Sequence, residues 1–158
     1  MDFNKYAAKG NEFLNRLAEN LGNPDNRDHA ARVLRSTLHV IRDYITIEES
    51  IQLLAQLPMM LKAVYVEGWS TAEKNTRIKT IDDFAAEVIH RDGNSAWRDF
   101  SNRDEVIQHI RKVIETLASY VSSGELEDVF SVLPKEIQRT FQLWLRQHIS
   151  NVPKYYQE

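Results

Sequence analysis

The 158-residue chain contains no cysteine. Without thiols it can form no disulfide, no thiolate nucleophile and no cysteine-ligated zinc or iron–sulfur centre. Glycine and proline are scarce, with five and four residues, and no glycines are spaced as in a phosphate-binding loop or a Gly-x-Ser-x-Gly nucleophile elbow. The sequence therefore argues against nucleotide-binding enzymes and serine hydrolases.

Long apolar runs and an excess of basic charge are missing as well. No segment approaches the roughly 18 consecutive apolar residues of a transmembrane helix, and the N-terminus lacks the basic and apolar regions of an export signal. The net charge is −3, whereas nucleic-acid binders usually carry a basic excess. We expect a cytoplasmic protein that binds neither membrane nor nucleic acid.

The apolar residues that are present recur at steps of three and four, and no stretch alternates in the way of a β-strand. Residues with helix-capping or helix-starting chemistry precede several of these stripes, among them Asn26, Thr46, Pro58 and Thr80. The pattern predicts an all-α protein of about eight helices in one domain over residues 1–158. The last helix should end near Asn151, with residues 154–158 as a frayed tail.

Two parts of the chain match each other at a constant offset. The Leu-Pro pair at Pro58 recurs at Pro134, and 134 − 58 = 76. Eight identities fall at this offset, and apolar positions answer apolar positions along the upstream segments. We expect two tandem, pseudo-symmetric four-helix repeats, at about 3–69 and 81–149, joined by a linker at about 70–80.

The first repeat carries a recognisable set of motifs, namely Leu34-x-x-x-Leu38-His39-x-Ile41-Arg42-Asp43, Glu48-Glu49, Gln56-Leu57-Pro58-Met59-Met60 and Tyr65-x-Glu67-Gly68-Trp69. Together these resemble the bacterial family called domain of unknown function 2267, over about Phe13 to Phe141. The resemblance implies an all-helical duplicated domain and no assigned activity. The second repeat departs from the first at Glu115, Leu143 and Leu145, which replace His39, Glu67 and Trp69.

Five residues near these motifs are candidates for an interaction surface or a pocket: His39, Arg42, Tyr65, Glu67 and Trp69. Tryptophan and tyrosine are enriched in binding hot spots, and a tryptophan just after a helix terminator is often partly exposed. The same residues could instead pack the junction of the repeats and brace a helix edge with ion pairs. Both interpretations remain open at the level of sequence.

No catalytic or metal-binding arrangement is apparent. The five histidines include no pair with ligand spacing on one helix face, and no His-Glu-x-x-His helix occurs. The sequence therefore predicts no catalytic residues, no metal and no cofactor. We expect a non-enzymatic helical module that binds a protein partner or assembles with itself; the alternative is a small-molecule ligand-binding or sensing domain with a pocket between the two repeats.

Overall fold

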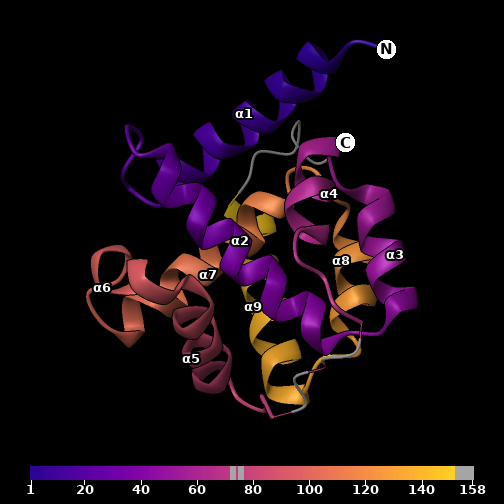
Figure 1. The fold of residues 1–158 in the computed structure, drawn as a ribbon. Coiled ribbons are helices and arrows are strands. Elements are labelled where there is room, and N and C mark those ends of the chain that lie inside the picture. Colours follow the sequence, from indigo (N-terminus) through magenta and orange to yellow (C-terminus); the bar gives the residue numbers. More distant parts are fainter. Residues whose placement is uncertain (72–73, 75–76, 152–158) are drawn as a thin grey trace.

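A computed structural model describes residues 1–71, 74 and 77–151 (Figure 1). These residues form eight helices of at least eight residues, one four-residue helix and a short 3-10 turn, and no strand occurs among them. The predicted all-helical fold is confirmed for this part of the chain. The elements are α1 (Phe3–Asn20), α2 (Arg27–Tyr44), α3 (Ile47–Gln56), α4 (Met59–Val66), α5 (Ile81–Asp92), η1 (Gly93–Ser95), α6 (Ala96–Asp99), α7 (Arg103–Leu117), α8 (Ser123–Phe130) and α9 (Lys135–Asn151).

Side chains placed just before the helices explain where most of them begin. The residues whose side chains accept a hydrogen bond from a first-turn amide are Asp2, Asn26, Thr46, Thr80, Asn102 and Ser122. Each satisfies an amide that has no partner within the helix. At Thr80 the carboxylate of Asp83 also accepts from the Thr80 amide, which completes a capping box.

Helix α1 is continuous through Gly10. The glycine is there because α1 and α4 approach closely: a Cβ atom at this position would lie 2.7 Å from Cβ of Met60. Only a residue without a side chain allows this contact. Gly10 therefore fixes the position of α1 on α4.

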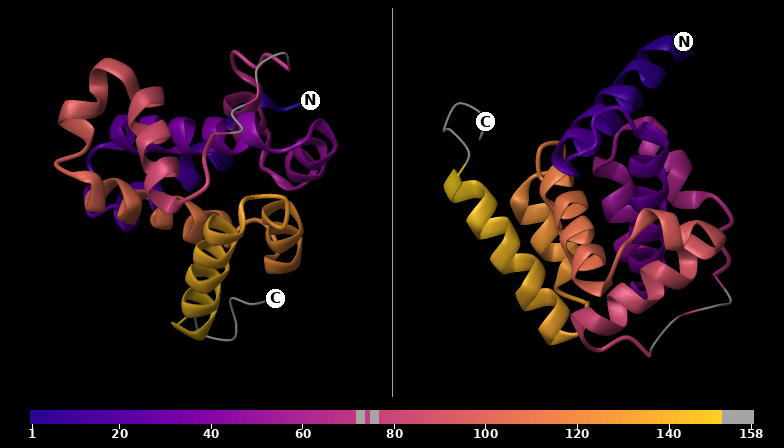
Figure 2. Two further views of the ribbon diagram at one scale, coloured as in Figure 1. Left: turned by 90° about the horizontal axis from the view of Figure 1, so that it is seen from below. Right: turned by 90° about the vertical axis from the view of Figure 1, so that its left-hand side faces the viewer.

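Helix α2 lies at the centre of the molecule and packs against α1, α4, α5 and α7. The first four helices and the later ones also meet where α3 contacts α8 (Figure 2). Aromatic rings fill much of the core, and Phe130 and Phe141 pack against each other at 5.0 Å between ring centroids. The two parts of the chain thus share one hydrophobic core.

The N-terminal half of α1 projects beyond the body of the protein (Figure 1). Its buried residues are Gly10, Phe13, Leu17 and Ala18, so none of them precedes Gly10. The first two turns therefore have little contact with the rest of the described chain.

No helix in the described ranges is long and apolar enough to cross a bilayer. The expected linker at 70–80 lies partly outside the described residues, and the expected tail at 154–158 lies wholly outside them.

Candidate functional site

The five predicted residues, which are His39, Arg42, Tyr65, Glu67 and Trp69, lie around the C-terminal end of α4. His39 Nε2 lies 2.7 Å from the carbonyl oxygen of Val64, and since a carbonyl only accepts, His39 donates through this nitrogen. Arg42 donates to the carbonyls of Tyr65 at 2.9 Å and Glu67 at 2.7 Å. The last carbonyls of a helix lack partners within it, so these α2 side chains stabilise the end of α4.

Tyr65 is fully buried, and its hydroxyl lies 2.6 Å from Ser50 Oγ. Burial raises the pKa of Tyr65 to about 12. Its ring meets Trp69 edge to face at 5.7 Å, and Trp69 is only partly buried. The aromatic pair therefore packs inward rather than forming a free surface.

Glu67 is exposed and pairs with Arg35 at 3.2 Å, with both side chains more than half accessible. The five predicted residues are thus neighbours, but none lines the three cavities described below. Their contacts show a bracing of α4, and their role as an interaction site or ligand pocket stays a prediction.

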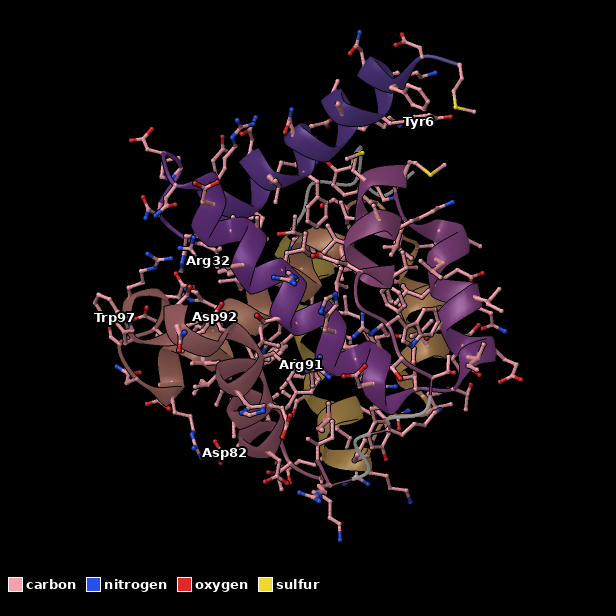
Figure 3. All side chains as sticks on the ribbon, viewed as in Figure 1. Tyr6, Arg32, Asp82, Arg91, Asp92 and Trp97 are labelled. Atoms are coloured by element: carbon pink, nitrogen blue, oxygen red, sulfur yellow. The ribbon has the colours of Figure 1, made fainter. Side chains whose placement is uncertain are left out.

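An ion-pair network extends from this cluster to α5. Arg42 Nε donates to Asp43 at 3.1 Å, and Asp43 also pairs with Arg91. In Figure 3 Arg91 lies between α5 and α2. The charged groups of α2 therefore hold both α4 and α5.

A polar cavity of about 480 Å³, which the sequence did not reveal, lies between the start of α2 and helices α6 and α7. Its polar lining includes His29, Arg32, Arg98, Asp99, Glu105 and His109. This is a pocket between the two parts of the chain, but it is formed by residues other than those predicted.

Asp99 is the buried acceptor at this cavity. Arg32 donates to both of its carboxylate oxygens, at 2.8 and 2.7 Å, and His29 Nδ1 donates at 3.0 Å. Burial by itself would raise the pKa of Asp99, but the hydrogen bonds outweigh it and hold this pKa well below its usual range. For the nearby Asp92, burial and the Asp99 carboxylate raise the pKa to about 7.

The second nitrogen of His29 lies 3.2 Å from Nε2 of His109. Two imidazoles in this contact hold one hydrogen between them, because two N–H groups facing each other would repel. Burial lowers the pKa of His109, and the charge of His29 lowers it further. The cavity wall therefore contains an imidazole pair that is anchored on the ionised carboxylate of Asp99.

These groups were missed because the chain separates them by long distances. His29 and Asp99 are 70 residues apart, and His29 and His109 are 80 apart. No group of three histidine, aspartate or glutamate side chains in the described residues is arranged to hold a metal ion. The one local signal was that Asn26 and Asn102 each cap a helix, which places His29 and Glu105 three residues after a cap in both helices.

A second cavity, of about 550 Å³, is an open groove formed by α3 and α4. Its lining is almost entirely apolar and includes Ile51, Ala55, Met59, Ala63 and Val66. Ile51 is 59 % exposed and Val66 is 45 % exposed. We call this surface the α3–α4 groove. A third, smaller cavity of about 360 Å³ lies beside the exposed Trp97 on α6.

Comparison with known families gives one match. Residues 10–140 match the family model described as "Uncharacterized conserved protein (DUF2267)". No curated protein matches the chain.

Proposed function

Because the chain belongs to the DUF2267 family, whose description names no activity, we propose a function from its surface: it is a non-enzymatic interaction module of the cytoplasm. The module binds a helix of a protein partner in the α3–α4 groove. The supporting observation is that the exposed side chains of this groove are apolar, although the fold does not require apolar residues at these positions.

The second part of the chain provides the comparison. Helices α2, α3 and α4 begin at residues 27, 47 and 59, and α7, α8 and α9 begin at 103, 123 and 135, which is 76 residues later in each case. This agreement supports a tandem duplication. The groove positions Ile51, Ala55, Met59, Met60, Ala63 and Val66 then correspond to Glu127, Ser131, Lys135, Glu136, Arg139 and Gln142.

The residues at the equivalent positions of α8 and α9 show which apolar side chains the packing of these helices requires. Equivalent helices keep their apolar residues at buried positions, such as Leu61 and Ile137, but carry charged or polar residues at the six exposed groove positions compared above. An exposed apolar side chain contributes little to folding, and large apolar patches on soluble proteins often mark interaction sites. The groove is therefore best explained by binding.

The shape of the groove favours a helical occupant. A channel lined by two neighbouring helices accepts the apolar stripe of a third helix, whose anchors recur at three- and four-residue steps. Two methionines, Met59 and Met60, lie at the surface, with 46 and 41 % exposure. Their flexible side chains adapt to different apolar shapes.

The proposal predicts site-specific cross-linking in the protein's native cells. A photoreactive phenylalanine analogue at position 51 should give protein adducts on illumination, because this position lies in the occupied groove. The same analogue at position 143 is the control, since Leu143 is 51 % exposed on α9, away from the groove. Equal labelling at the two positions, or none at position 51, would contradict the proposal.

A second candidate function is binding of a small polar ligand in the cavity at His29 and His109. It is supported by the cavity of about 480 Å³ and by the convergence there of two imidazoles, two guanidinium groups and a buried carboxylate. Native mass spectrometry of protein purified from its own cells should then show a small-molecule adduct. The adduct should be reduced in His109→Leu and kept in His90→Leu, whose histidine lies on α5 outside the cavity lining. Loss of the adduct in both variants, or no adduct in the native protein, would exclude this function.

A further inference from the structure

We infer that the helix bound in the α3–α4 groove is the projecting N-terminal part of α1 from a second copy of this chain. This inference rests on the proposed function, because it names the occupant of the same groove. It adds a specific segment, a closed dimer and a symmetry.

The first two turns of α1 carry an apolar stripe without a partner in the described chain. Phe3, Tyr6 and Ala7 are spaced as neighbours on one helix face. Phe3 is 73 % exposed, Ala7 is exposed and Tyr6 is only partly buried. Figure 3 shows Tyr6 on the part of α1 that extends from the body. Apolar side chains that gather on an exposed helix face often mark an interaction site.

The stripe and the groove have matching chemistry. The stripe presents Phe3, Tyr6 and Ala7 at the three- and four-residue steps by which helices anchor in apolar grooves. The groove offers an open apolar channel of about 550 Å³. Each surface is exposed in the single chain, and each would cover the other.

Charge is complementary beside the two apolar surfaces. Lys9 borders the stripe on α1, since it lies three residues after Tyr6 and thus beside it on the helix surface. Glu48 is exposed on α3, three residues before Ile51 and thus on the same side of that helix. Opposite charges at the rim of an interface guide the direction of docking.

The stripe cannot fill the groove of its own chain. Helix α1 is continuous from Phe3 to Asn20 and is held on α4 by the close contact of Gly10 with Met60. Residues 3–9 therefore continue in a straight line past α4, as Figure 1 shows. To enter their own groove they would have to break the helix that positions them.

A second copy of the chain can cover the stripe and the groove at the same time. With each projecting segment in the groove of the other chain, the two contacts are identical and related by a two-fold axis. Such an arrangement closes as a dimer and leaves no groove or stripe free for a third copy.

The test is the mass of the intact protein in solution, measured by sedimentation equilibrium over a range from micromolar to millimolar. The weight-average mass should rise from 18.4 kDa toward twice that value. Phe3→Ser and Ile51→Glu should each weaken the dimer at least tenfold, whereas Leu143→Gln should leave it unchanged. All three positions are exposed, and circular dichroism will verify that each variant is folded.

Mixing the two interface variants gives the decisive arm. The Phe3→Ser chain keeps its groove and the Ile51→Glu chain keeps its stripe, so a mixed dimer regains one intact contact. The mixture should associate more strongly than either variant alone. No recovery on mixing would overturn the inference, because a groove-to-groove or stripe-to-stripe contact predicts none.

The result also separates this inference from the proposed function. A strict monomer whose position 51 cross-links to a different protein would overturn the self-association and keep the interaction module. A strict monomer without cross-links at position 51 would overturn both.

Discussion

Replacing Arg42 with methionine should lower the free energy of unfolding by about 3 kcal/mol. Methionine keeps much of the apolar stem but removes every donor. Arg42 is 3 % exposed, and its guanidinium bonds to the carbonyls of Tyr65 and Glu67 as well as to Asp43. Its loss leaves carbonyls at the end of α4 without partners, and buried polar groups without partners are costly. Urea denaturation monitored by circular dichroism measures the change.

Arg35 provides a matched control on the same helix. It also reaches the end of α4, where it pairs with the Glu67 carboxylate, but both side chains are more than half exposed. Exposed ion pairs typically contribute less than about 1 kcal/mol, so Arg35→Met should change the free energy of unfolding by a few tenths of a kcal/mol. Similar losses in the two variants would show that the buried carbonyl contacts do not determine the stability of this region.

The beginnings of helices could be predicted from the sequence because they depend on neighbouring residues. Asn26, Thr46 and Thr80 cap helices as expected, since capping needs only a side-chain oxygen within three residues of an amide. Helix α6 was not anticipated. It spans four residues, too few for an apolar period, and Asp99 at its end makes contacts with His29 and Arg32 of α2. Such contacts have no local signature.

The five candidate residues around Tyr65 were predictable as a group but not in their role. The spacing of His39 and Arg42 placed them on one flank of α2, and both contact the end of α4. Their partners are backbone carbonyls, which every residue possesses and which no motif reveals. The sequence could therefore suggest a cluster at Tyr65 without showing that its polar groups serve the backbone.

The α3–α4 groove illustrates a different limit. A helical stripe of apolar residues predicts burial. The sequence alone does not show which residues of such a stripe stay exposed at the surface. Leu61 is 2 % exposed, whereas Met59 and Met60, its neighbours in sequence, are more than 40 % exposed. At the 76-residue offset, Met59 and Met60 correspond to the charged Lys135 and Glu136. This difference becomes informative only once the structure shows that the two methionines are exposed.

Acidification should destabilise the protein through His39. Burial is the main cause that lowers the pKa of His39 from the usual 6.5 to about 4; nearby arginines including Arg42 act in the same direction, and the bond to the Val64 carbonyl opposes them. Between these pH values the unfolded chain binds the proton more readily than the folded chain. Stability conferred by the neutral imidazole is therefore complete above about pH 6.5 and is lost as the pH falls toward 4, at a cost on the order of 2–3 kcal/mol.

The contribution of His39 has to be measured by comparing the pH dependence of stability in the wild type and in a His39 variant, because Asp92 acts in the opposite direction. Its raised pKa means that the folded chain binds a proton more readily than the unfolded chain up to about pH 7, so Asp92 favours folding on acidification. His39→Gln keeps an N–H donor for the Val64 carbonyl and does not titrate in this range, while Asp92 remains in both proteins. Urea denaturation at several pH values should show the variant losing about 2–3 kcal/mol less than the wild type between neutral pH and about pH 4. Parallel pH profiles for the two proteins would mean that His39 accepts a proton in the folded state as easily as in the unfolded chain.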